Sequence, residues 1–170
     1  MTHDARHRLM SVRLEHDVLT SRPESVQHEV QTALRDLLQD NLFVPYDEDH
    51  GEAFSGPFDL VLRSHDNRLI FSVYAAQNGP LLAEYSLSIS PFRSIIRDYF
   101  IVCDSYEEAV HTTSASRVEA IDMGRRSIHN EGSELLRELL SEQISLDLNT
   151  ARRLFTLITV LHARWSGGVK

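Results

Sequence analysis

FDLVLRSHDNRLIFSVYAAQNGPLLAEYSLSISP, residues 58–91, is the stretch that decides the fold of this 170-residue chain. Apolar and polar side chains alternate along three runs, a period typical of strands that bury one face. The runs are Phe58–Arg63, Arg68–Tyr74 and Leu81–Ile89. The links between them, Ser64-His65-Asp66-Asn67 and a turn at Asn78-Gly79, are so short that neighbouring strands must be antiparallel. The stretch therefore predicts a three-stranded antiparallel meander.

A further strand is predicted at Ser11–Leu19, where Val12, Leu14 and Val18 alternate with polar residues. We expect it to join the meander or to lie beside it. The capping box Ser21-Arg22-Pro23-Glu24 follows, and apolar residues then recur every three to four positions. This spacing predicts an amphipathic helix to about Asn41.

The chain after the meander has helical spacing throughout. Ser90-Pro91 provides a cap and a first-turn proline for a helix, which we expect to break near Asp104. The next helix is predicted from Ser116 to about Ser141. A final helix is predicted to begin at Asp147 or Asn149.

Strands followed by helices indicate an α+β fold. We expect a small antiparallel sheet, made of the meander and the N-terminal strand, with helices packed mainly on one face and a helical C-terminal half. The length and the absence of a linker-like segment predict a single globular domain over residues 1–170. Within it, residues 1–8 are expected to be flexible and residues 42–57 to form an acidic loop.

Composition argues against several classes of function. Lys and Arg number 17 against 25 Asp and Glu, a net charge of −8, which disfavours binding to nucleic acid. The sequence has neither a secretory signal nor an apolar run that could span a membrane, so a cytoplasmic location is expected. The single Cys103 is expected to be a reduced thiol that fills the core.

No metal or cofactor is predicted. The loop Asp47–Glu52 offers carboxylates and one imidazole, but it lacks the spacing of a calcium loop, and no zinc motif occurs in the chain. Residues 150–170 carry four basic residues and no carboxylate. This asymmetry is either ordinary surface variation or a means of attracting a partner, including a second copy of the chain in a homo-oligomer.

The helix from Ser116 breaks two local rules. Arg125 falls on its apolar line, where a charge needs a partner, so we expect its guanidinium to contact a carboxylate or a bound anion. Gly124 and Gly132 each weaken the helix by about 1 kcal/mol relative to Ala. Two glycines so placed indicate either a close backbone approach or a local break.

The same segment contains the candidate site. Arg125 and Arg126 share a helix face with His129, and two guanidiniums beside an imidazole suit an anion and a mobile proton. Glu131 and Glu134 could orient the arginines or accept protons. The alternative is a structural ion-pair network that ties this helix to its neighbours.

Arg152 and Arg153 extend the candidate site. They follow the start of the final helix, where the helix dipole disfavours cations. The connection between the last two helices is short, so the helices are expected to be antiparallel neighbours. We therefore predict that Arg126, His129 and Arg152 or Arg153 converge on one surface suited to a multivalent anion.

Three stretches resemble a family of bacterial proteins known only as uncharacterised. They are Leu87–Arg93 running on to Asp98–Phe100, Glu119–Arg126 with His129–Leu136, and Thr150–Ile158 with Leu161-His162. The resemblance covers roughly residues 85–165 and implies no activity. It coincides with the candidate site residues.

Two functions remain open from the sequence. One is a non-catalytic binding or adaptor domain for a protein or a small anionic partner. The other is an enzyme or ligand-binding protein for a phosphorylated or carboxylated molecule. In that case Arg125 and Arg126 would clamp the anion, His129 would act as acid or base, and Glu131 or Glu134 would orient it.

Overall fold

The computed structural model describes residues 5–15 and 24–167. The strands are β1 (Leu9–Leu14), β2 (Phe43–Pro45), β3 (Phe58–His65), β4 (Arg68–Ala75), β5 (Leu81–Ser88) and β6 (Ile144–Leu146). The helices are α1 (Glu24–Gln39), α2 (Arg93–Thr112), α3 (Ala115–Leu140) and α4 (Leu148–Gly167), with short 3-10 turns at Ala5–His7 and Ser90–Phe92. The predicted α+β class, with a helical C-terminal half, is confirmed.

The predicted meander is present. β3 pairs antiparallel with β4, and β4 pairs antiparallel with β5, with Leu62 opposite Phe71 and Phe71 opposite Tyr85. The predicted N-terminal strand also joins this sheet, beside β3, but begins at Leu9 and ends at Leu14; Val18 lies outside the described residues.

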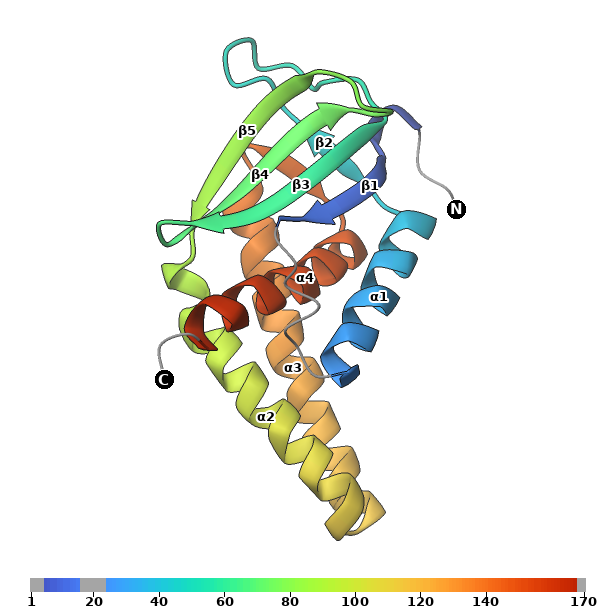
Figure 1. The fold of residues 1–170 in the computed structure, drawn as a ribbon, viewed down its shortest axis with the longest axis vertical. Helices are drawn as coiled ribbons and strands as arrows, with labels where there is room; N and C mark the ends of the chain where they lie inside the picture. Colours follow the sequence, from blue (N-terminus) through green and yellow to red (C-terminus); the bar gives the residue numbers. More distant parts are fainter. Residues whose placement is uncertain (1–4, 16–23, 168–170) are drawn as a thin grey trace.

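The direction of β1 corrects the expectation of a wholly antiparallel sheet. β1 runs parallel to β3, with Val12 opposite Leu60. Between the two strands the chain passes through α1, which lies beneath the sheet (Figure 1). A helical crossover of this kind returns the chain to the same end of the sheet, so the second strand runs parallel to the first.

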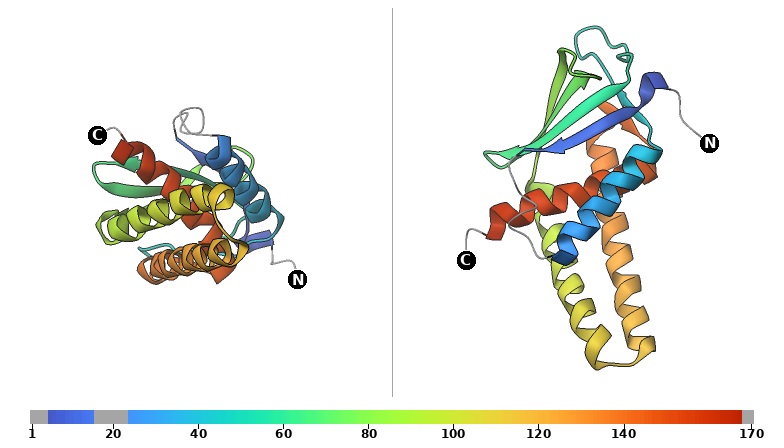
Figure 2. Two further views of the ribbon diagram at one scale, coloured as in Figure 1. Left: turned by 90° about the horizontal axis from the view of Figure 1, so that it is seen from below. Right: turned by 45° about the vertical axis from the view of Figure 1, so that its right-hand side comes forward.

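The helices cover one face of the sheet, as predicted (Figures 1 and 2). Alternate residues of the meander turn toward them and are buried. These residues are Phe58, Leu60, Leu62, Leu69, Phe71, Val73, Tyr85 and Leu87. The opposite face carries ion pairs: Arg63 lies 3.6 Å from a Glu15 carboxylate oxygen and 3.7 Å from one of Glu84.

A second, two-stranded sheet was not predicted. β2 lies inside the segment expected to be an acidic loop, and it pairs antiparallel with β6, which connects α3 to α4. Each strand has only three residues, too few for a period of two to stand out. Phe43 and Ile144 are fully buried, so part of the 42–57 segment belongs to the core.

Buried Asn41 holds the end of α1 to the sheet. Its side-chain oxygen accepts a hydrogen bond from the Leu9 backbone N–H at 2.7 Å, and its amide donates to the carbonyls of Leu9 and Leu37. Nearby, the Arg8 guanidinium donates to the Gln39 carbonyl at 3.0 Å. Ser21-Arg22-Pro23, the start of the capping box expected for this helix, lies outside the described residues.

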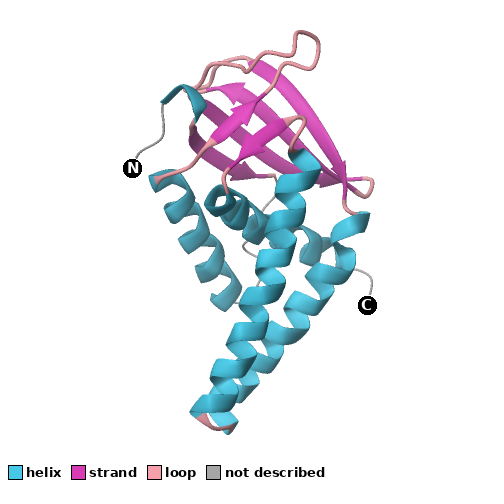
Figure 3. Ribbon diagram, turned by 180° about the vertical axis from the view of Figure 1, so that it is seen from behind, coloured by secondary structure: helices cyan, strands magenta, loops and turns pink. Residues whose placement is uncertain are grey.

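α2 and α3 form a long antiparallel hairpin that extends away from the sheet (Figure 3). The break expected near Asp104 is wrong, because α2 continues to Thr112, and the Ser105 hydroxyl donates to the Ile101 carbonyl inside the helix instead of capping a new one. The cap of α3 is Ser114, whose hydroxyl accepts from the Arg117 N–H, and not Ser116. α3 ends at Leu140, next to the predicted Ser141.

α4 lies at the centre of the molecule. Every residue from Leu154 to Leu161 is buried, including Thr156 and Thr159, because α1, α3 and the sheet pack around it. α4 begins at Leu148, next to Asp147, one of its two predicted starts, and the Asp147 carboxylate accepts from the Thr150 N–H at 2.9 Å. No helix of the described residues is long and apolar enough to cross a membrane.

Gly132 is the point of close approach between α3 and α4. A Cβ at this position would lie 2.1 Å from the Phe155 ring, whereas one at Gly124 would meet no atom within 4 Å. α3 is continuous through both glycines. Of the two alternatives left open by the sequence, Gly132 therefore marks a close approach and not a break.

These two glycines give a matched pair of substitutions. Gly132→Ala is expected to lower the free energy of unfolding by roughly 1–3 kcal/mol, because the buried Phe155 ring cannot move away cheaply. Gly124→Ala is expected to raise it by up to about 1 kcal/mol through helix propensity alone. Urea denaturation of both variants checks this. Equal changes in the free energy of unfolding for the two variants would contradict the close contact between Gly132 and Phe155.

Candidate functional site

A cleft of about 240 Å³ opens where the four helices meet. Side chains from every helix line it, and all of those described except Ala33 are polar. They are Glu29 and Thr32 with Ala33 on α1, Tyr99 on α2, Arg125, Arg126, His129 and Asn130 on α3, and Arg152, Arg153 and Thr156 on α4. All five of the arginine and histidine candidates named from the sequence thus line one cleft; their role in ligand binding stays a prediction.

The two candidate glutamates are placed elsewhere. Glu131 and Glu134 are exposed on α3, and neither lines the cleft. The roles suggested for them beside the arginines are therefore not supported by their position. The carboxylates beside the arginines belong instead to Glu29 on α1 and to Asp122, one turn before Arg125 and Arg126.

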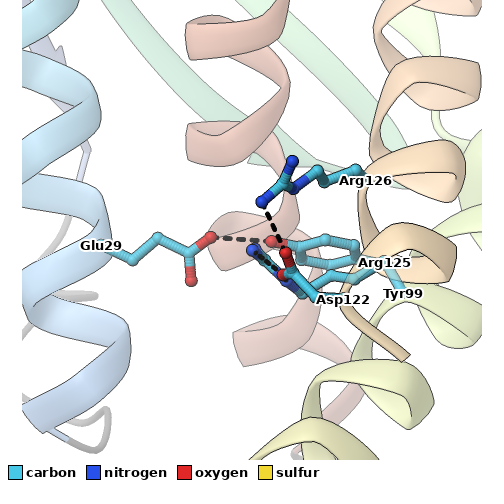
Figure 4. Close-up of polar contacts among 5 residues, drawn as sticks. All are labelled: Glu29, Tyr99, Asp122, Arg125 and Arg126. Atoms are coloured by element: carbon cyan, nitrogen blue, oxygen red, sulfur yellow. Dashed lines mark hydrogen bonds and ion pairs between the residues drawn. The ribbon is translucent and has the colours of Figure 1, made fainter. Parts of the chain in front are cut away.

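Asp122 holds both arginines of α3 (Figure 4). Its Oδ1 accepts from Arg125 Nε at 3.1 Å and Nη2 at 2.6 Å, while its Oδ2 lies 2.7 Å from Arg126 Nη2. The expectation that Arg125 contacts a carboxylate is confirmed. The Arg125 hydrogen bonds hold the pKa of the Asp122 carboxyl below its usual range. Arg125 also lies over the Tyr106 ring, 5.6 Å from its centre.

Tyr99 connects α2 to α1 across the cleft. Its hydroxyl donates to Glu29 Oε1 at 2.7 Å, and the Glu29 side chain reaches from α1 toward it (Figure 4). The ring is buried at 2% exposure. Burial, reinforced by the Glu29 charge, raises the pKa of the Tyr99 hydroxyl well above its usual range, so it stays a protonated donor.

His129 forms the inner wall of the cleft. Its Nε2 lies 2.8 Å from the Thr156 hydroxyl, and its ring packs between Phe155 and Tyr99, with centres 5.2 and 5.5 Å away. Burial, together with the charges of Arg152, Arg125 and Arg153, lowers the pKa of His129 to about 4. The imidazole is therefore neutral at neutral pH.

A pKa of about 4 is low for a group that transfers protons at neutral pH. A general base works best with a pKa near the working pH. Within the described part of the chain, no carboxylate orients the ring, and its Nδ1 lies 3.5 Å from the Ser133 hydroxyl. The arrangement provides a neutral hydrogen-bonding wall.

The arginines of α4 differ in their partners. Arg152 Nε donates to the Asn130 side-chain oxygen at 2.9 Å, and its Nη2 donates to the same atom. Among the described residues, no carboxylate forms an ion pair with Arg152. Arg153 Nη2 lies 3.9 Å from Asp36 of α1, a distance at which the attraction between the charges is weak.

Helix periodicity explains why these residues meet. Arg125 and Arg126 precede His129 by four and three positions, and Arg152 and Arg153 precede Thr156 by the same spacings. α3 and α4 pack against each other, and the contact at Gly132 brings the two faces together. Sequence reasoning missed Glu29, because a single glutamate on the polar side of a helix carries no signal for a partner far along the chain.

The charges in and around the cleft do not balance. Four guanidiniums meet three carboxylates, those of Glu29, Asp36 and Asp122, on a chain whose overall charge is −8. Arg126 keeps 70% of its side chain exposed although it is paired. Guanidiniums are planar, permanently charged donors that suit carboxylate and phosphate oxygens. The cleft can therefore hold an anion.

The fold and the cleft define a small α+β protein with an arginine-lined site between its helices. The chain belongs to the Uncharacterised protein family (UPF0262), whose model matches residues 6–164. A relative in Caulobacter vibrioides is 45% identical over 169 residues, covering 98% of this chain and 100% of its own length. One in Hyphomonas neptunium is 46% identical over 156 residues, covering 92% of this chain and 93% of its own length. No solved structure matches the chain.

The neutral state of His129 predicts a specific pH dependence. Its pKa of about 4 lies below the value near 6.5 of an unfolded histidine, so the unfolded chain binds more protons between these values. The stabilisation is present above pH 6.5 and is lost as the pH falls through 4. We expect acidification over this window to reduce the free energy of unfolding more in the wild type than in His129→Gln. Urea titrations at several pH values measure the difference, and parallel curves would contradict the assignment.

Proposed function

We propose that this protein is a non-catalytic binding protein that takes a small phosphorylated or carboxylated ligand in the arginine-lined cleft. The observation that carries the proposal is the environment of Arg152. Its guanidinium is half-buried and faces a neutral amide in place of a carboxylate. A partly buried charge is costly without a counter-charge, and a ligand anion would supply one.

Three features support a small ligand and binding without chemistry. The cleft volume of about 240 Å³ lies just below the usual range for drug-sized ligands. Its histidine is neutral and lacks an orienting carboxylate among the described residues. The exposed guanidinium of Arg126 lies on the same cleft as Arg152, so one anion could bridge α3 and α4.

The proposal places the protein in the cytoplasm, where small phosphorylated and carboxylated molecules are abundant. It does not require a second copy of the chain, because all the arginines of the cleft come from one chain. A homo-oligomer stays a prediction from the charge asymmetry, to be measured by analytical ultracentrifugation.

Substitution of Arg126 tests the proposal. Arg126→Gln is expected to raise the dissociation constant for inorganic phosphate about tenfold, the effect of losing one charge-assisted hydrogen bond. Its side chain is 70% exposed, so the fold should survive. Isothermal titration calorimetry measures the affinity.

The matched control is Arg97→Gln on α2. Arg97 is also 70% exposed and lies beside Asp98, outside the cleft. We expect it to bind phosphate as the wild type does. Equal losses in both variants would indicate a general charge effect, and the absence of binding of either phosphate or a phosphate monoester to the wild type would refute the proposal.

A further inference from the structure

Glu29 is out of place in a cleft that binds only an anion. Among the described residues that line the cleft it is the one carboxylate, and it comes from a different helix than the arginines. A negative charge there opposes a bound anion, because like charges in a partly buried site repel. Glu29 is not needed as a partner for the arginines of α3, because Arg125 and Arg126 both pair with Asp122.

The contacts of Glu29 leave it available to a ligand. Within the part of the chain that the structure describes, its Oε1 accepts one hydrogen bond, from the Tyr99 hydroxyl at 2.7 Å. No cation of the described part of the chain forms an ion pair with it. An ionised carboxylate offers about four lone-pair positions, so further donors can be accepted. The Tyr99 oxygen is already engaged by the Arg125 guanidinium, so the acceptor positions open to a ligand belong to the Glu29 carboxylate.

The tyrosine also fixes where the carboxylate points. Tyr99 is buried beneath the cleft, and its hydrogen bond draws the Glu29 side chain across from α1 (Figure 4). An ion pair between flexible side chains gains little, because ordering them costs entropy. A carboxylate held in advance by a buried phenol avoids part of that cost. This is the arrangement of a pre-oriented acceptor.

We propose that the cleft selects a small ligand that carries both an anionic group and an ammonium group. The anion lies against Arg126 and Arg152, and the ammonium lies against the Glu29 carboxylate. The proposal rests on the proposed function and names its ligand class. It requires the two ends to be a few bonds apart, since the cleft holds only about 240 Å³.

The test compares phosphoethanolamine with glycerol 3-phosphate and inorganic phosphate by calorimetry at pH 7. These three ligands share the phosphate and differ in whether an ammonium, hydroxyl groups or nothing further is attached. We expect phosphoethanolamine to bind the wild type about tenfold more tightly than the other two. Equal affinities for the three would overturn the inference and leave the proposed function standing. Absence of binding by all three would overturn both.

Glu29→Gln separates a ligand contact from a structural role. The amide keeps an acceptor for Tyr99 but removes the charge, so the affinity for phosphoethanolamine is expected to fall about tenfold while that for inorganic phosphate is unchanged or rises. Tyr99→Phe should move the two affinities in the same directions by a smaller factor. The matched control is Glu108→Gln, an exposed glutamate of α2 outside the cleft. A parallel loss of affinity for both ligands in Glu29→Gln would overturn the inference.

Discussion

The packing of α3 against α4 at Gly132 is the constraint on which the rest of the structure depends. The Phe155 ring occupies the space where any side chain at position 132 would lie. α4 is buried over its whole middle section, so the ring cannot turn outward. The distance between the two helices is therefore fixed by one missing Cβ, and a larger residue would force them apart.

That distance determines the chemistry of the cleft. The residues one and two turns from Gly132 on α3 include His129 and Arg125, and those beside Phe155 on α4 include Arg152 and Thr156. Because the helices approach closely, the His129–Thr156 hydrogen bond can form at 2.8 Å, and the Arg152 guanidinium reaches Asn130. α1 also packs against α4, and its Glu29 lines the same cleft. The apolar packing between α3 and α4 thus positions the charged side chains of the site.

Features that depend on local periodicity could be predicted from the sequence. Features that depend on contacts between distant segments could not. The meander and the positions of the four helices follow from spacing along the chain, and so does the expectation that Arg125 contacts a carboxylate, which the structure identifies as Asp122. The parallel pairing of β1 depends on the path of α1, which periodicity does not encode. The strands β2 and β6 are about 100 residues apart and exist only because they pair with each other. Glu29 joins the site through Tyr99, 70 residues away, and no local pattern could indicate that pairing.

The central claim is that the arginines of α3 and α4 hold one anion between them. Nuclear magnetic resonance of the arginine Nε–H groups observes them directly during a titration with inorganic phosphate. The account predicts saturable shifts of the Arg126 and Arg152 signals with a single dissociation constant, accompanied by the Asn130 side-chain amide and with no change at Arg97. Shifts confined to exposed arginines outside the cleft, or linear drifts of all arginines without saturation, would contradict it.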